Sequence, residues 1–235
     1  MGQIHAWFWP RALTDKSALR DAATTIVQRQ TLKGPAVLMG QRGADAAFMP
    51  GKFVFPGGAI DAVDDTVSVA DIALDVQGAL HAESARTPSA IVAAAIRELW
   101  EESGLILGKP GTWDAPPQGW RAFAATGHVP SAQGCRFFFR AVTPMGRPRR
   151  FDARFILVDA DAIASDLDDF SRAEDELSHL QWVPLKDARS FDLPFITQVV
   201  LAELIGGAPS KDGVPFFRND DEDRLVSRLG GASPI

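Results

Sequence analysis

The segment Ala93–Leu105, AAAIRELWEESGL, gives the strongest indication of the fold and the chemistry of this chain. Wound as an α-helix at about 100° per residue, it places Glu98, Glu101 and Glu102 within an arc of roughly 100°. The opposite side of the same helix carries apolar residues, namely Val92, Ile96, Leu99 and Trp100. One face is therefore suited to a core, and the other concentrates negative charge.

The residues on either side define the ends of this helix. Thr87 offers a hydroxyl for the N-cap, and Pro88 suits the first helical position. Gly104 follows Ser103 and suits a left-handed C-cap. The sequence predicts a helix from Pro88 to about Ser103.

Three carboxylates on one helical flank repel one another, by roughly 0.2 to 0.5 kcal/mol for each pair three or four residues apart. Arg97 can pair with Glu101, but one arginine does not neutralise three carboxylates. Mg²⁺ or Mn²⁺ would complete the charge balance, since both ions take oxygen ligands and bridge carboxylates to phosphates. The alternative, which is common for such runs, is a solvated acidic face.

A second pattern lies upstream, at Phe55-Pro56-Gly57-Gly58. Two glycines after a strand-like FVF run predict a tight turn whose backbone can approach a ligand or a metal closely, because a Cβ would obstruct that approach. Taken alone, the pattern equally fits an ordinary surface turn.

The rest of the chain alternates strand and helix signals, which indicates an α/β fold. The predicted elements are a hairpin of strands at 23–30 and 36–42, a helix at 67–83, a short helix or strand at 120–126, strands at 136–142, 153–158 and 181–183, and an amphipathic helix at 193–205.

Composition limits the functional class. The 235 residues fit one domain, with 46% hydrophobic and 23% charged residues typical of a globular protein. A net charge of −6 argues against a nonspecific nucleic-acid clamp but not against an anionic small molecule held through a cation. The single cysteine, Cys135, and the lack of a long apolar run predict a cytoplasmic protein that does not bind membranes.

Together the two patterns resemble the Nudix box, G-x5-E-x7-R-E-U-x-E-E-x-G-U. Residues 97–105, RELWEESGL, match its second half at every defined position, and Gly58 matches its first glycine. The resemblance implies an α/β/α sandwich with a mixed sheet. It also implies that Glu98, Glu101 and Glu102 ligate Mg²⁺ or Mn²⁺, with the Gly58 carbonyl as a further ligand, and that Arg97 orients the glutamates.

Two departures from the family pattern distinguish this chain. Asp64 stands where the first glutamate of the box belongs, and Gly58 lies 39 residues before Arg97 where the pattern expects 14. About 25 residues are thus inserted, at approximately 65–87, within a single domain spanning 1–235. Because loop closure costs only about 0.6 kcal/mol per doubling of length, the core geometry can persist, and we expect the helix at 67–83 to lie beside the site.

An inserted box followed by RRFDARF at 149–155 resembles the peroxisomal-type coenzyme A diphosphatases and their bacterial relatives. The upstream coenzyme A pattern of that branch is half present, because Leu38, Arg42 and Gly51 align with it but Ala47 replaces its second arginine. The resemblance implies hydrolysis of coenzyme A or acyl-coenzyme A. ADP-ribose or another nucleotide sugar is an alternative substrate, and a catalytically silent nucleotide-binding regulatory module is an alternative function.

Hydrolysis of a pyrophosphate also needs groups that bind the substrate and a base that accepts a proton from water. We expect Arg42 and Arg154 to contact phosphates, and the backbone at Gly57 to approach the substrate. Glu101 and Glu102 are assigned catalytic roles together with Arg97. The base is left open among Glu101, Glu102 and two loop residues, Glu174 and Glu176. The family resemblance is also compatible with a homodimer.

Overall fold

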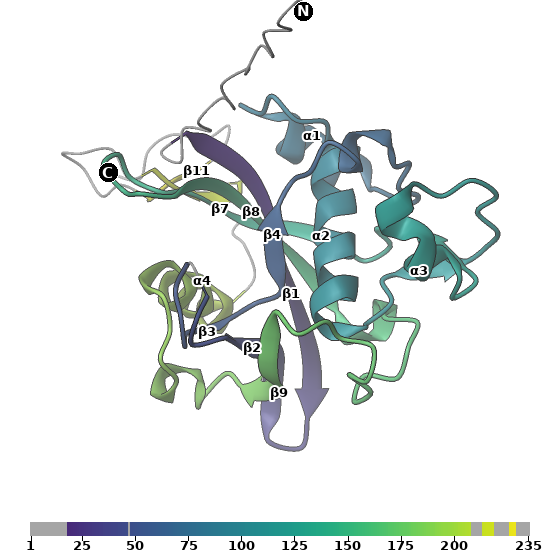
Figure 1. The fold of residues 1–235 in the computed structure, drawn as a ribbon. Helices are drawn as coiled ribbons and strands as arrows, with labels where there is room; N and C mark the ends of the chain where they lie inside the picture. Colours follow the sequence, from purple (N-terminus) through teal and green to yellow (C-terminus); the bar gives the residue numbers. More distant parts are fainter. Residues whose placement is uncertain (1–17, 47, 208–212, 219–225, 229–235) are drawn as a thin grey trace, which may run out of the picture.

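A mixed β-sheet of nine strands forms the centre of the computed structural model, which describes residues 18–46, 48–207, 213–218 and 226–228 (Figure 1). Its described strands run in the order β11-β10-β7-β8-β1-β2-β3, while β4 pairs with β1 and β9 pairs with β2. Their bounds are β1 Leu19–Thr31, β2 Gly34–Arg42, β3 Phe53–Val54, β4 Gly57–Ala59, β7 Arg136–Val142, β8 Arg150–Asp159, β9 Leu177–Pro184, β10 Pro215–Phe217 and β11 Val226–Arg228. β1 runs parallel to β8 and antiparallel to β2 and β4, so the sheet is mixed.

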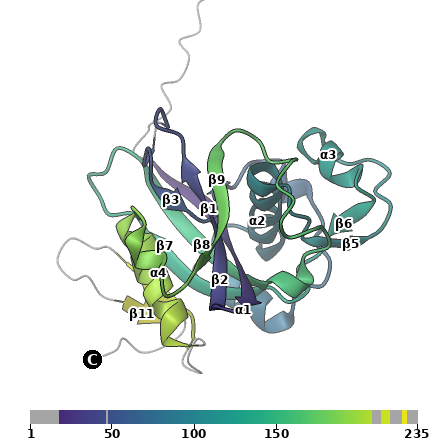
Figure 2. The same cartoon turned by 90° about the horizontal axis from the view of Figure 1, so that it is seen from below.

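Helices cover both faces of this sheet. α2, Pro88–Ser103, packs on one face, and α4, Phe195–Gly206, lies on the other, as the two views show (Figures 1 and 2). The shorter helices are α1, Leu74–His81, and α3, Arg121–Ala124. A separate two-stranded sheet joins β5, Gly108–Pro110, to β6, His128–Pro130. The predicted α/β/α layers and the C-terminal helix are confirmed.

The long first strand separates two hydrophobic cores. Successive side chains of a strand point to opposite faces, so Ala23 and Val27 join the core beneath α2 while Ile26 joins the core beneath α4. On the α2 side the Thr25 hydroxyl donates a hydrogen bond to the carbonyl of Ala95 at 2.9 Å. This contact fixes α2 against the strand that runs beneath it.

The predicted limits of the glutamate helix are confirmed. Thr87 Oγ1 accepts a hydrogen bond from the Ala90 amide at 3.2 Å, and Pro88 occupies the first turn. Gly104 adopts φ 73°, the left-handed conformation that a side chain disfavours, and its amide donates to the Trp100 carbonyl.

The strand predictions are also largely confirmed, with longer elements in most places. The predicted hairpin forms between β1 and β2, with its turn at Leu32 and Lys33. β7 has the predicted bounds, whereas β8 and β9 extend beyond theirs. The ambiguous segment at 120–126 contains the short helix α3.

The inserted segment differs from the prediction, because only Leu74–His81 of the expected 67–83 helix is helical. Asp71 has φ 59°, a left-handed conformation that a helix cannot contain, and its carboxylate accepts hydrogen bonds from Lys109 and Ser131. The segment before α1 instead forms a bridge at Ala70. α1 packs against α2 and β7 near the start of α2, away from the turns that carry the glutamates (Figure 1).

No helix among the described residues combines the length and the apolar character that crossing a bilayer requires.

Candidate active site

Arg97 is the centre of a buried ionic cluster at the end of α2. Its Nε donates to Asp64 Oδ1 at 3.0 Å, and its Nη2 donates to Asp64 Oδ2 at 2.9 Å. The same Nη2 donates to the Ala59 carbonyl at 3.0 Å. Burial alone would lower the pKa of Arg97, but the hydrogen bond to Asp64 and the nearby glutamates raise it above its ordinary value, so the guanidinium stays charged.

Two of the three helix glutamates share the remaining donor of Arg97. Nη1 donates to Glu98 Oε1 at 2.8 Å and to Glu101 Oε2 at 2.9 Å. The side chain of Glu98 is 12% exposed and that of Glu101 is 28% exposed. Arg97 therefore contacts both carboxylates and turns them toward the same side of the helix.

The third carboxylate, Glu102, is almost completely buried. Its Oε2 accepts a hydrogen bond from the Gly57 amide at 2.7 Å. Its Oε1 is buried and has no hydrogen-bond partner in the described part of the chain. A buried oxygen without a partner is costly, and such an atom in a native site is explained by a bound water or ion.

Burial raises the pKa of Glu98 and of Glu102, because the cluster holds too little positive charge to stabilise both ionised forms. It raises the pKa of Glu98 to about 7, against the lowering effect of Arg97. It also raises the pKa of Glu102 well above its ordinary value, although the Gly57 amide opposes that shift. Desolvation disfavours the charged form, and one arginine does not offset it for the whole cluster.

The donor set fits a hard divalent cation by its chemistry. It consists of carboxylate oxygens, one of which lacks any partner, and such oxygens are the ligands that Mg²⁺ and Mn²⁺ prefer. Within the described ranges, no group of three or more acidic, histidine or cysteine side chains is arranged to hold a metal as it stands. Arg97 Nη1 instead lies between Glu98 and Glu101, so metal binding requires these side chains to turn.

The two glycines pack so closely against their neighbours that no side chain would fit at either position. They belong to strand β4, which pairs with β1, rather than to the isolated turn that the sequence suggested. A Cβ on Gly57 would lie 2.6 Å from the Ala23 carbonyl oxygen, and one on Gly58 would lie 2.4 Å from Glu98 Oε1. The backbone of the two glycines therefore does approach other groups closely. The groups that it approaches in this structure are the side chains of Glu98 and Glu102.

A loop before β9 carries further acids to the cluster. The Glu174 amide donates to the Glu101 carbonyl at 2.7 Å, which ties the loop to the end of α2. Glu176 forms an ion pair with Arg42 Nη2 at 2.9 Å and contributes to raising the pKa of both Glu98 and Glu102. Both loop candidates for the base therefore lie near the glutamates.

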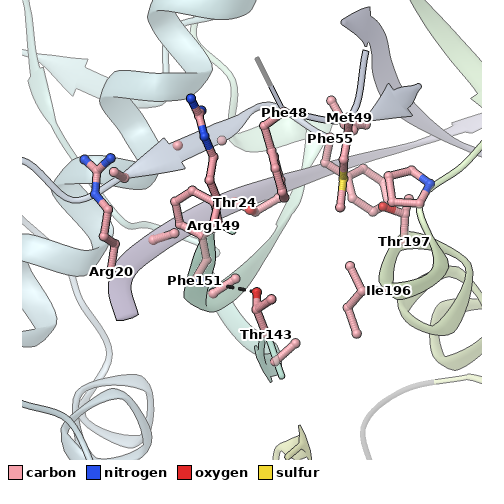
Figure 3. Close-up of a pocket in the computed structure, with 18 of the residues that line it drawn as sticks. Arg20, Thr24, Phe48, Met49, Phe55, Thr143, Arg149, Phe151, Ile196 and Thr197 are labelled. Atoms are coloured by element: carbon pink, nitrogen blue, oxygen red, sulfur yellow. Dashed lines mark hydrogen bonds between the residues drawn. The ribbon is translucent and has the colours of Figure 1, made fainter. Parts of the chain in front are cut away.

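A cavity of about 680 Å³ opens beside the glycine pair, on the face of the sheet opposite α2 (Figure 3). Its floor consists of small residues on adjoining strands, among them Ala22, Ala59, Ala141 and Ala153. Phenylalanines form much of its wall, and Phe48 and Phe151 meet edge to face with ring centroids 5.3 Å apart. Small residues on the floor and large ones on the wall account for the hollow.

The predicted substrate residues Arg42 and Gly57 line this cavity, as does Gly58. Arg42 also donates through Nε to the Phe48 carbonyl at 3.0 Å, so its guanidinium is already oriented at the edge of the cavity. Ala47, where the coenzyme A pattern has an arginine, lies outside the described residues. The glutamate cluster and the cavity thus adjoin across strand β4.

Arg154 requires a correction, because the structure removes it from the predicted phosphate contact. It is 1% exposed, and its guanidinium bonds to Asp21 and Asp152 and to the Ser84 hydroxyl. Arg140 bonds to the same Asp152 and to the carbonyls of residues 82 and 83. These arginines connect the segment after α1 to the sheet, which is a structural role.

Sequence reasoning missed two groups at this site. The bidentate partner of Arg97 is Asp64, which the sequence marked only as a shorter acid in the box. Arg20 and Arg149 both line the cavity, and neither was singled out as a ligand residue. Arg20 precedes residue 23, where the first strand was predicted to begin. The prediction therefore did not place Arg20 on the same strand face as Thr24.

Some known proteins are similar to this chain in sequence and in structure. No protein-family model matches the chain. Over 184 residues it is 28% identical to nudix hydrolase 7 of Caenorhabditis elegans, an alignment that covers 73% of this chain and 53% of that protein. The chain therefore spans about half the length of this curated relative.

A solved structure, the NUDIX hydrolase from Alicyclobacillus acidocaldarius, is similar with a TM-score of 0.61 and 28% sequence identity. The match covers 81% of this chain and 93% of that one. The predicted fold class, a Nudix fold with a mixed sheet and helices, is thereby confirmed. The chain is thus similar to Nudix hydrolases in both sequence and fold.

Proposed function

We propose that this chain is a metal-dependent pyrophosphohydrolase that cleaves a nucleoside diphosphate linked to another group. The observation that carries the proposal is Glu102, which is buried against the Gly57 amide, beside Glu98 and next to an open cavity, with one oxygen that has no partner among the described residues. A solvated acidic face would not desolvate these carboxylates. Their burial is costly unless a bound cation compensates it.

Glu98, Glu101 and Glu102 would hold Mg²⁺ or Mn²⁺, with the carbonyl of Gly58 as a further candidate ligand, since Gly58 packs against the Glu98 carboxylate. When bound, the cation neutralises the diphosphate and lowers the pKa of a coordinated water. Arg97 keeps the glutamates in position through Nη1, and Asp64 holds Arg97. The protein thus supplies a fixed cluster of oxygen ligands beside the backbone of the glycine pair.

Two residues at the edge of the cavity are proposed to act on the substrate directly. Arg42 binds an oxygen of the diphosphate, because its guanidinium lines the cavity close enough to Glu102 to lower the pKa of that carboxyl. Glu176 accepts the proton of the attacking water. Its side chain is 56% exposed and lines the cavity, and it does not belong to the group of helix ligands.

The cavity is proposed to receive the part of the substrate that extends from the pyrophosphate. Its volume of about 680 Å³ lies in the range of small-molecule sites, and its phenylalanines suit an apolar or aromatic group. Coenzyme A and acyl-coenzyme A are the first substrates to test, with ADP-ribose as the alternative. Phosphopantetheine and adenosine 3',5'-bisphosphate would be the products in the first case, and AMP with ribose 5-phosphate in the second.

A metal-supplemented hydrolysis screen of nucleoside diphosphate derivatives tests this function. We expect Glu102→Gln to lower kcat at least about 100-fold, because it removes a ligand from the cluster. The matched control is Glu203→Gln on α4, which makes the same chemical change outside the glutamate cluster and the cavity. Isothermal titration of Mg²⁺ and Mn²⁺ into both variants measures metal binding separately from turnover.

The proposal fails if no derivative is cleaved with either metal, or if Glu102→Gln retains the activity of the unsubstituted chain. Stability gives a second readout. Since burial raises the pKa of Glu102, removal of its charge should increase the free energy of unfolding in EDTA while activity is lost. A merely structural glutamate would show the opposite change in stability.

A further inference from the structure

The cavity extends from the glycine pair toward the beginning of β1 and β8. Thr24 pairs with Gly57, and Arg20 lies four residues earlier on the same face of β1. Four residues of strand span about 13 Å. Arg20 is opposite Phe151 in the parallel register with β8, so this end of the cavity is bounded by an arginine and an aromatic ring.

The charge of this cavity is opposite to that of the whole chain. The chain has a net charge of −6, yet the cavity is lined by Arg20, Arg42, Arg147 and Arg149 and by a single acid, Glu176. Arg42 is paired with Glu176 near the glycines. Positive charge is therefore in excess at the far end, where the other three arginines lie.

Three of these arginines, Arg20, Arg147 and Arg149, have no side-chain partner in the part of the chain that the structure describes. Their guanidinium groups make no hydrogen bond or ion pair there, whereas Arg86, Arg140 and Arg154 are each bound to aspartates. Arg149 is half-buried and Arg20 is exposed. Figure 3 shows their side chains extending in the same direction along the cavity.

Two like charges that line one cavity with apolar walls repel each other unless an anion lies between them or nearby. The guanidinium is planar and always charged, and its donors match the oxygens of a phosphate bidentately. Phe48 and Phe151 line the same cavity as Arg149 and give it an apolar wall, and a charged contact is stronger in such surroundings than in water (Figure 3). The arrangement thus suits a phosphate group better than a neutral one.

We propose that Arg20 and Arg149 form a second anion site, which binds a phosphate group that the substrate carries apart from its pyrophosphate. The site selects nucleotides with an additional phosphomonoester over those without one. This inference rests on the proposed function only in placing the pyrophosphate at the glutamates. Arg20 and Arg149 themselves are assigned to specificity and not to the chemical step.

Calorimetric titration with small nucleotides tests the second site without requiring turnover. The probes are adenosine 3',5'-bisphosphate, adenosine 2',5'-bisphosphate and AMP, added to the full chain with Mg²⁺. We expect at least one bisphosphate to bind about tenfold more tightly than AMP or better. In the Arg20→Gln/Arg149→Gln variant the preference should fall to about twofold or less.

Arg121→Gln on α3 is the matched control, because Arg121 is exposed and does not line the cavity. It should keep the full preference. Melting temperatures of all three proteins show whether folding is intact. The inference is overturned if the unsubstituted chain binds AMP and both bisphosphates equally, if it binds neither bisphosphate, or if the preference survives the double substitution.

Hydrolysis is measured separately on the same preparations. If the unsubstituted chain cleaves a derivative but shows no phosphate preference, the second anion site is rejected and the proposed function stands. Phosphate preference without cleavage of any derivative would do the reverse.

Discussion

Replacement of Gly58 by alanine should abolish most activity while leaving the fold intact. The added Cβ would lie 2.4 Å from Glu98 Oε1, 2.5 Å from its Cδ and 2.6 Å from Oε2. An ordinary contact is 3.4 Å or longer, so the carboxylate must move by about 1 Å. That movement breaks the 2.8 Å hydrogen bond from Arg97 Nη1 and displaces a proposed metal ligand.

A misplacement of about 1 Å at a reacting centre can cost roughly 100-fold in rate, which is the expected fall in kcat for Gly58→Ala. The free energy of unfolding should change by less than about 1 kcal/mol, because the clash involves the flexible end of a side chain. Gly57→Ala supplies the contrast. Its Cβ would meet the backbone of Ala23 and Thr24 at 2.6 and 2.7 Å, so we expect a loss of about 1 to 3 kcal/mol in stability.

The assay combines steady-state hydrolysis of the best substrate with urea unfolding of both variants. Divalent-metal affinity of Gly58→Ala, measured by titration, should fall together with kcat. The reasoning is refuted if Gly58→Ala keeps the kcat of the unsubstituted chain, or if it loses more stability than Gly57→Ala does.

Three further predictions concern stability. The pKa of Glu98 is raised in the folded state from 4.5 to about 7, so its stabilising contribution is complete below pH 4.5 and is lost as pH rises through 7. Urea unfolding in EDTA should therefore show a free energy lower by about 3 kcal/mol at pH 8 than at pH 4.5 from this group, and saturating Mg²⁺ should reduce the difference. Asp64→Asn breaks a buried bidentate pair with Arg97 and should cost about 3 kcal/mol in urea, and a wild-type midpoint would contradict this. Arg154→Gln should lose a similar amount, because it removes the buried ion pairs of Arg154 with Asp21 and Asp152, with KM within twofold of the unsubstituted value, and a large rise in KM would restore the phosphate contact that the sequence suggested.

Local patterns were sufficient to predict the glutamate helix and its limits. Thr87, Pro88 and Gly104 act within one turn of the helix ends, and the spacing of the glutamates follows from 3.6 residues per turn. The same holds for the strands, whose alternation depends on neighbouring residues only. The left-handed Asp71 broke the predicted inserted helix, because its conformation is tied to the distant Lys109 and Ser131.

By itself the sequence determined an α/β chain with a carboxylate-bearing helix and a pair of glycines whose backbone can approach another group closely. Only the tertiary structure decided that these glycines pack against β1 and the helix glutamates, and which arginines line the cavity. Asp64 reaches Arg97 across 33 residues, Glu102 reaches Gly57 across 45, and Arg154 reaches Asp21 across 133. Contacts over such separations are set by how the sheet and helices pack. The sequence alone does not distinguish an arginine that is buried between aspartates from one that faces a cavity.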